Sequence, residues 1–217
     1  MVLGIYCAGG FGGVTLGLAN KINELDNKWE KIYFIEDNEE KANIGENIIT
    51  FAEFNEKHPA DNAEIVIAAG EPRTREILFN KVKTAGYTLP NLIHPWANVE
   101  NVLEIGEGNI ILTFACVSAS GVKIGNNNIV MQYAQISHDS VIGSHCVIAT
   151  SANISGTTVV RDRAYIAVGA KLREGITVGY DAIAGMGAIV TKSIDDQSVV
   201  MGIPAKEVRK NTGKVFK

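Results

Sequence analysis

Two histidines lie close together in the stretch "QISHDSVIGSHC", which runs from Gln135 to Cys146. His138 is followed directly by Asp139, and His145 is followed by Cys146. Imidazole titrates near neutral pH, so His138 could act as a general base whose ring is oriented by Asp139. The same side chains could instead form a metal site, a cysteine–histidine pair or a solvated polar corner. Which of these applies depends on the element that carries them.

A six-residue repeat runs through the C-terminal half of the chain. Every sixth residue from Val99 to Val117, and again from Ile124 to Val190, is Val, Ile or Leu, with Ala184 as the one exception. A period of six is neither the helical period nor the alternation of a single strand. It is typical of a parallel β-helix, in which three short strands make one triangular coil and stacked coils bury a column of aliphatic side chains. No proline lies between Pro95 and Pro204, so ladders of roughly five such coils can form without interruption.

The repeat places the two histidines on different sides of the triangle. His138 follows the aliphatic Ile136 by two residues, so its side chain is expected off the buried column. Cys146 takes a small-residue position near a turn, and His145, in the next hexapeptide, is expected at the surface. A tetrahedral metal ion shared by His138, His145 and Cys146 is therefore disfavoured.

Strand and helix patterns alternate in residues 1–92. The apolar runs "VLGIYC", "KIYFI" and "AEIVIAA" predict strands, and apolar residues at helical spacing predict helices over Val14–Leu25 and Arg73–Ala85. This alternation favours a small Rossmann-like parallel sheet, and hence an α/β domain over residues 1–92 followed by a β-helix domain over residues 93–217. Ligands bind at the C-terminal ends of parallel strands, which here are Cys7–Gly13, Glu36–Asp37 and Gly70–Arg75.

The glycine turn "AGGFGG" follows the first predicted strand. Gly10, Phe11 and Gly12 supply the start of a dinucleotide fingerprint, but Thr15 stands where its third glycine belongs. A glycine turn before a helix can still receive a phosphate, or it can be a tight strand–helix connection without a ligand. Both interpretations stay open at this point.

The composition excludes several classes of protein. A net charge of −4 and a pI of about 5.6 give no basic footprint for nucleic acid. No stretch approaches the roughly 18 apolar residues of a membrane span, and "MVLGIYCAGG" lacks the basic start of a signal peptide. Three cysteines in unrelated contexts are expected to be free thiols, which favours a cytoplasmic location. The two tryptophans, Trp29 and Trp96, are expected to be packing residues.

Motifs spread over nearly the whole chain carry a resemblance to one family. They are "IYCAGGFG", "YFIEDN", "IAAGEPRTRE", "NLIHPWA", "QISHDSVIG", "GAIVTKSI" and "VVMGIPAKEVRK". With these motifs the chain resembles the bacterial sugar O- and N-acetyltransferases, which include the sialic acid O-acetyltransferase type and enzymes that acetylate UDP-4-amino-sugars. The resemblance implies a left-handed β-helix, a homotrimer with acetyl-CoA bound between subunits, and an N-terminal domain that binds a nucleotide-sugar acceptor. No metal is expected.

The same resemblance assigns roles to residues at the two sites. His138 is the expected general base, and Asp139 is its acidic neighbour. A cysteine nucleophile is not required, because an amine or hydroxyl can attack a thioester directly. The residues expected to bind the acceptor are Gly10, Phe11, Gly12, Glu36, Asp37, Gly70 and Arg75. Of these, Phe11 replaces a histidine found in the UDP-4-amino-sugar enzymes.

Small and apolar residues are expected along the path of acetyl-CoA, although each glycine could equally serve a tight turn of a coil. The predicted contacts are Val147, Gly156, Ala167, Val168, Gly185, Met186 and Gly187. Those same enzymes carry a second histidine at the position of Val147. A backbone N–H group, such as that of Gly156, is therefore expected to face the thioester carbonyl.

Several functions stay open. The first is an acetyltransferase acting on a nucleotide-linked amino sugar. The alternatives are O-acetylation of a free sugar such as sialic acid, and a non-catalytic trimer that binds a sugar nucleotide. A β-helix of the carbonic-anhydrase kind needs three histidine ligands, whereas the repeat holds only His138 and His145, so neighbouring subunits would have to supply the rest.

Overall fold

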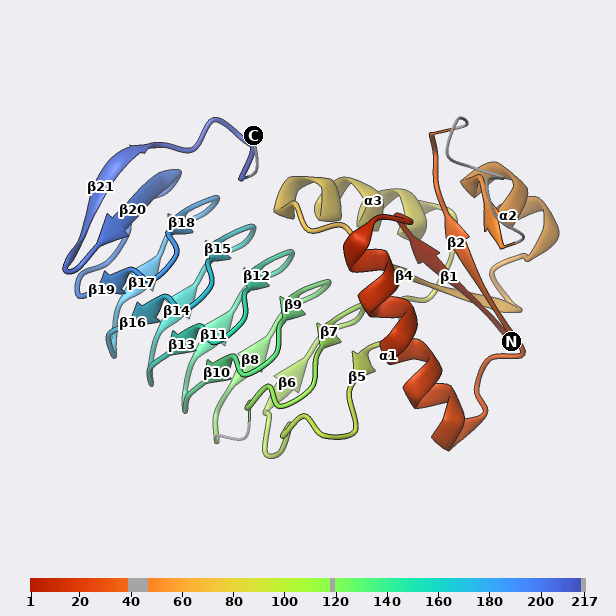
Figure 1. Ribbon diagram of the computed structural model, residues 1–217, viewed down its shortest axis with the longest axis horizontal. Helices are drawn as coiled ribbons and strands as arrows, with labels where there is room; N and C mark the ends of the chain where they lie inside the picture. The colour runs from red at the N-terminus through yellow and green to blue at the C-terminus, as the bar shows by residue number, and fades with distance from the viewer. Residues whose placement is uncertain (39–46, 118–119, 216–217) are drawn as a thin grey trace.

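The computed structural model describes residues 1–38, 47–117 and 120–215. An N-terminal parallel sheet with its helices lies beside a prism of short stacked strands (Figure 1). The expected order, an α/β domain followed by a β-helix, is confirmed.

The N-terminal sheet has four parallel strands in the order β3-β2-β1-β4. The strands are β1 (Val2–Tyr6), β2 (Lys31–Ile35), β3 (Ile48–Ile49) and β4 (Ala63–Ile67), and the helices are α1 (Gly10–Asp26), α2 (Phe51–Lys57) and α3 (Pro72–Thr84). All five residues of β1 are buried, as expected of a central strand covered on both faces.

Two features of this domain differ from the sequence-based expectation. Helix α1 begins at Gly10 rather than at Val14, so the glycine turn is itself the first turn of the helix, with Gly9 as N-cap. The periodicity does not predict β3 or α2, because both are short. Thr50 and Glu53 nevertheless carry a signal for α2, since they form a capping box at its start.

The β-helix is built from two-residue strands that form three parallel sheets. The strands are β5 (Leu92–Ile93), β6 (Glu104–Ile105), β7 (Ile110–Ile111), β8 (Lys123–Ile124), β9 (Ile129–Val130), β10 (Gln135–Ile136), β11 (Val141–Ile142), β12 (Val147–Ile148), β13 (Asn153–Ile154), β14 (Val159–Val160), β15 (Tyr165–Ile166), β16 (Lys171–Leu172), β17 (Thr177–Val178), β18 (Ile183–Ala184) and β19 (Ile189–Val190). The second residue of each strand from β7 onward is the aliphatic of the repeat, apart from Ala184, and it lies in the buried core. Ile105, in the first strand of its sheet, is 37% exposed.

A hairpin of β20 (Ser198–Gly202) and β21 (Ala205–Lys210) closes the far end of the prism. The chain then returns toward α3, where the backbone N–H of Val215 donates to the carboxylate of Glu71 at 3.0 Å (Figure 1).

The corners of the prism explain the small residues of the repeat. The residue at each corner has a positive φ, as in Asp139 (55°) and His145 (62°). The next residue, Ser140 or Cys146 in these two cases, is fully buried in the narrow interior, where only a small side chain fits.

Helix α3 is fastened along one of these corners. Its residues contact a column of corner residues through Arg75 with Asn127, Phe79 with His145, and Arg73 with Asp181. Arg163 on the same corner pairs with Glu76 of α3 at 2.9 Å. Helix α1 packs on another surface, where Leu18 and Ala19 share an apolar cluster with outward residues of the β-helix such as Ile110.

The position of α3 overturns one sequence-based expectation. His145 is buried rather than at the surface, because the ring of Phe79 packs against it at 5.2 Å and the amide of Asn127 lies 3.0 Å from its Nδ1. Trp29 is buried as expected. Trp96 is exposed instead, and stacks on Phe114 with ring centroids 5.8 Å apart.

Candidate active site

His138 lies just after strand β10, on an uncovered corner of the prism. Its Nδ1 is 3.0 Å from Oδ2 of Asp139, and the His138 side chain is 55% exposed. The backbone carbonyl of His138 accepts a hydrogen bond from the N–H of Thr157 on the next coil at 2.8 Å. The structure therefore holds His138 and Asp139 as a hydrogen-bonded pair, as the sequence predicts.

Gly156 lies one coil beyond His138 and touches its ring. A Cβ at Gly156 would collide with Nε2 and Cε1 of the imidazole. The N–H of Gly156 has no hydrogen-bond acceptor in the part of the chain that the structure describes. The imidazole thus lies next to a residue whose backbone N–H is unoccupied.

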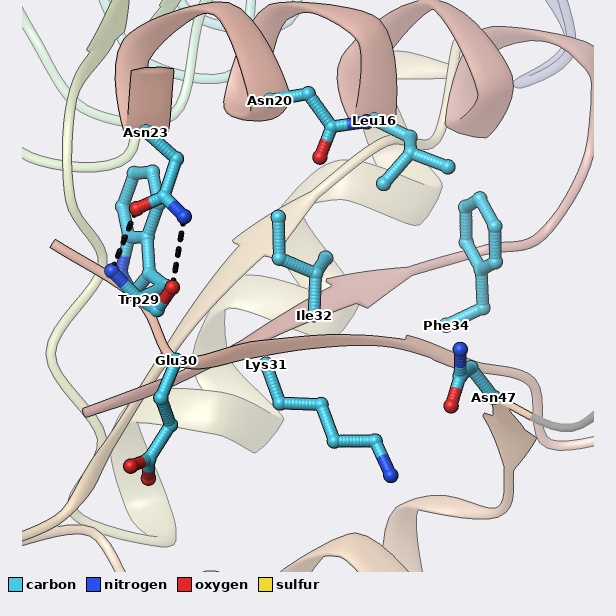
Figure 2. Close-up of a pocket in the computed structure, with 9 residues that line it drawn as sticks. All are labelled: Leu16, Asn20, Asn23, Trp29, Glu30, Lys31, Ile32, Phe34 and Asn47. Carbon is cyan, nitrogen blue, oxygen red and sulfur yellow. Dashed lines mark hydrogen bonds between the residues drawn. The ribbon is translucent and has the colours of Figure 1, made fainter. Parts of the chain in front are cut away.

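The corner with His138 is an open surface. Four cavities of about 200–500 Å³ lie elsewhere on the chain. One of about 390 Å³ lies between α1 and β2, where Ile32 points toward the helix and the amide of Asn23 bonds the backbone of Trp29 (Figure 2). Its lining contains no histidine and none of the predicted site residues, so it does not compete with His138 as a catalytic centre.

The glycine turn forms the N-terminus of α1. Gly9 caps the helix without a side-chain hydrogen bond, and the first turn contains no acidic residue. Gly12 must be glycine, since a Cβ there would collide with the carbonyl oxygen of Cys7, whereas nothing surrounds the corresponding position of Gly10. Phe11 is half-buried against the apolar cluster of α1. The open N–H groups at this helix start suit an anionic ligand.

Glu36 and Asp37 lie beside this turn, as expected for the end of β2. Oδ2 of Asp37 accepts hydrogen bonds from Tyr6 Oη at 2.6 Å and from Lys81 Nζ at 2.8 Å. Partial burial opposes ionisation of Asp37, but these hydrogen bonds and the charge of Lys81 hold its pKa below the usual range. Oε2 of Glu36 lies 3.5 Å from the N–H of Ala8 in the glycine turn. Gly70 lies partly exposed at the end of β4.

Arg75 is a correction to the predicted acceptor site. Its side chain is 0% exposed and its guanidinium is enclosed between β4 and the β-helix. It therefore does not touch a ligand bound at the sheet edge. The sequence places Arg75 correctly near the strand end but gives no sign that α3 turns this residue inward.

The predicted acetyl-CoA residues divide into exposed and buried groups. Val168 and Met186 are exposed, Met186 by 73%, and Gly187 is an exposed corner with φ of 66°. Ala167 is partly buried. Two predictions need correction: Val147 is buried in the apolar cluster it shares with α1, and Gly185 lies beneath Met201, which a Cβ would strike at 2.7 Å. Neither residue lies open to a ligand in the single chain.

Among the residues that the structure describes, no group of three or more His, Cys, Asp or Glu side chains could hold a metal ion. His145 and Cys146 are buried on the corner under α3, and His138 lies on another corner, so the three residues do not form one site. Within the described ranges no helix is long and apolar enough to cross a membrane.

The parallel sheet and the triangular coils, together with the similarities that follow, place the chain in the left-handed β-helix acyltransferase superfamily. Residues 2–82 match the PglD N-terminal domain, and residues 121–156 match the bacterial transferase hexapeptide (six repeats). The chain belongs to the bacterial sugar acetyltransferases that join these two parts.

Solved structures resemble the chain over almost its full length. WeeI from Acinetobacter baumannii AYE is 30% identical with a TM-score of 0.87, and the alignment covers 96% of this chain and 100% of that one. The acetyltransferase domain of PglB from Neisseria gonorrhoeae FA1090, in complex with acetyl coenzyme A, is 28% identical with a TM-score of 0.85, covering 95% and 98%. PerB from Caulobacter crescentus, in complex with CoA and GDP-perosamine, has a TM-score of 0.85 over 96% and 98% of the two chains; at 24% identity it shows the fold alone.

Curated relatives match only part of the chain. Acyl-[acyl-carrier-protein]–UDP-N-acetylglucosamine O-acyltransferases of Pseudomonas putida and Pseudomonas aeruginosa are 31% identical over 110 residues. The match spans 48% of this chain and 43% of those proteins, so the chain spans less than half the length of the curated relatives it matches.

Proposed function

We propose that this protein transfers the acetyl group of acetyl-CoA to an amino group of a nucleotide-linked sugar, with His138 as general base. The observation that carries the proposal is the pairing of His138 Nδ1 with Asp139 Oδ2 at 3.0 Å beside Gly156, whose backbone N–H is open. The likeness to the PglB acetyltransferase domain bound to acetyl coenzyme A supports the class of donor.

The pair gives each nitrogen of His138 a separate task. When Nδ1–H donates to Asp139, the lone pair of the ring lies on Nε2. As the sugar amine attacks the thioester carbonyl, Nε2 takes the proton that the new amide nitrogen loses. The tetrahedral intermediate then collapses, the carbon–sulfur bond breaks, and the imidazolium returns its proton to the CoA thiolate. The products are an acetamido sugar and free CoA.

The negative oxygen of the intermediate needs a hydrogen-bond donor. Val147 is buried and apolar, so it cannot replace the second histidine found in the UDP-4-amino-sugar enzymes. Gly156 adjoins the His138 ring, and we assign its backbone N–H as the donor to this oxygen.

The open surface around His138 supports a site completed by a second copy of the chain. A ligand as long as acetyl-CoA needs a cleft with two sides, and a single β-helix provides only one of them. We therefore propose a homotrimer, with acetyl-CoA between subunits along the exposed Val168, Met186 and Gly187. Free cysteines support a cytoplasmic location, and we keep residues 1–92 and 93–217 as the proposed domain division.

The acceptor is proposed to bind at the open helix start Gly10–Gly12, with Phe11 beside it and with Glu36, Asp37 and Gly70 at the adjoining strand ends. The N–H groups of Gly10–Gly12 suit phosphate, and the carboxylates suit the hydroxyl and N–H donors of a nucleoside. A hydroxyl acceptor is the second candidate, because the curated relatives are named as O-acyltransferases of UDP-N-acetylglucosamine.

A screen of acceptors tests the proposal. Purified protein with acetyl-CoA is offered UDP- and GDP-linked 4-amino sugars, UDP-N-acetylglucosamine and free sialic acid, and released thiol and product mass are followed. Thiol release with an N-acetylated nucleotide sugar supports the proposal. An O-acetylated product supports the second candidate, and nucleotide binding without transfer to any acceptor supports a non-catalytic trimer.

A further inference from the structure

Arg75 is a fully buried arginine that joins the two domains. Its Nε donates to the carbonyl of Asn127 at 2.9 Å, and its Nη2 donates to Oδ1 of the same residue at 2.6 Å. Its Nη1 donates to the carbonyls of Ile67 at 2.7 Å and Ala69 at 2.9 Å. One guanidinium thus holds the end of β4 and a corner of the β-helix together.

Asn127 is shaped to receive this side chain. It is a fully buried corner residue with φ of 54°, and its Nδ2 donates back to the carbonyl of Arg75 at 2.9 Å. The planar guanidinium fixes direction as well as distance, because its donors have a rigid geometry. The two domains are therefore aligned here by directional hydrogen bonds in addition to apolar packing.

The carbonyls that Arg75 binds lie at the edge of the acceptor-binding domain. Ala69 directly precedes Gly70, and both lie beyond the last residue of β4. The sheet continues only as far as the N–H of Ala68, which donates to Tyr6 O at 2.9 Å. Carbonyls at and beyond the last residue of a strand need another donor, and Arg75 supplies it to Ile67 and Ala69.

The charge of Arg75 makes a purely structural role costly. In the described part of the chain no carboxylate contacts the guanidinium, which has carbonyl and amide oxygens as its partners. Burial lowers the pKa of Arg75 to about 9. Replacing buried ionic groups by well-packed apolar residues is often neutral or stabilising for a fold. Stability alone therefore does not account for an arginine at this position.

We propose that Arg75 is a positioning residue: it holds the Ile67–Gly70 edge in register with the β-helix and thereby places the acceptor relative to a catalytic histidine. The kinetic consequence rests on the proposed function. The structural consequence, a fixed Ile67–Gly70 segment, does not depend on catalysis.

The kinetic test compares Arg75→Lys and Arg75→Met with the wild type, using the nucleotide sugar that gives product in the acceptor screen. Both variants are expected to raise the KM for that acceptor about tenfold and to leave the KM for acetyl-CoA within about twofold, because misplacement affects the acceptor. Lysine keeps the charge but not the planar fork. A wild-type acceptor KM in folded Arg75→Lys would show that the register is not set by this fork, and would overturn the proposal.

Arg163→Met is the matched control. Arg163 binds Glu76 of the same helix and Asp181 of the β-helix, and within the described chain its hydrogen bonds do not include β4. It is expected to leave the acceptor KM within about twofold. If Arg163→Met raised the acceptor KM equally, the effect would come from general loosening of α3, which would contradict the proposal.

Hydrogen exchange gives a readout without catalysis. Arg75→Lys is expected to accelerate exchange of the Ala68 amide, while the Ser137 amide, which donates to Ile154 O at 2.9 Å within the β-helix, stays unchanged. If the wild type acetylates none of the offered acceptors, the proposed function fails, and exchange alone decides the positioning role.

If the Arg75 variants do not fold, Asn127→Gly serves instead, because it removes Oδ1 and Nδ2 where glycine accepts the positive φ. Unchanged Ala68 exchange in folded Asn127→Gly would overturn the proposal.

Discussion

His138 and Gly156 are separated along the chain but lie against each other on adjacent coils. The sequence allows this contact to be predicted, because equivalent positions of a three-sided coil recur every 18 residues, as in the pairing of Gln135 with Asn153. The bond between His138 and Asp139 also follows from their adjacency. The burial of Val147 and Gly185 does not, since it depends on side chains contributed by α1 and β20.

Gly156→Ala tests the contact at the histidine. The new methyl group would displace the exposed imidazole, which can swing outward, so the melting temperature is expected to change little. We expect kcat to fall by about 10–100-fold, because a small displacement of a catalytic group is costly. Gly17→Ala in α1, where nothing surrounds the added carbon, is the control and should retain wild-type kcat. Full activity of Gly156→Ala would argue against a catalytic role for the ring position seen here.

At the scale of elements, the repeat reveals the β-helix because each hexapeptide buries its own aliphatic, such as Ile136 or Ile154. No comparable sequence period marks the corner that α3 covers. His145 and Arg75 therefore read as a surface residue and a ligand contact, although both are buried where the two domains meet. Their burial depends on packing between segments far apart in sequence, which no local pattern records.

Asp181 tests how firmly α3 is attached. It accepts two hydrogen bonds from Arg163, at 3.1 and 3.0 Å, and one from Arg73 at 3.0 Å. Burial opposes its ionisation, but these partners hold the pKa of Asp181 below its usual value. Asp181→Asn is expected to lower the free energy of unfolding at pH 7 by about 2 kcal/mol.

The lowered pKa of Asp181 fixes how the stability difference between wild type and Asp181→Asn should change with pH. A depressed pKa in the folded state contributes its full stability above the unfolded value of about 3.9 and loses it as the pH falls toward the folded pKa. Urea unfolding should therefore show a constant gap between wild type and Asp181→Asn from pH 7 down to about pH 5, and a shrinking gap below about pH 4. A gap that grows on acidification would contradict the ion-pair account.

At the scale of the whole molecule, a single chain leaves both His138 and the proposed acetyl-CoA path open. Met186 is 73% exposed, and Val168 on the preceding coil is exposed as well. Exposed apolar side chains along a binding edge suit contact with a ligand or a second subunit. The trimer is therefore part of the proposed mechanism rather than an addition to it.

Met186→Asp tests whether acetyl-CoA binds along the exposed Val168 and Met186. Placing a carboxylate there is expected to raise the KM for acetyl-CoA about tenfold by repelling the CoA phosphates, with the KM for the acceptor within about twofold. Val208→Asp, at an exposed apolar residue of β21, is the control and should change neither constant.

Sedimentation velocity at assay concentration should show a trimer, and a fully active monomer would rule out the shared site.

Acetyl transfer by His138→Ala is the most direct test of general-base catalysis by His138. The side chain is exposed and off the buried column, so the variant should keep the fold, the oligomeric state and the affinity for the nucleotide. Its kcat should fall by roughly 10²–10⁴, the usual contribution of a general base. A purified His138→Ala protein that turns over at the wild-type rate would contradict that role.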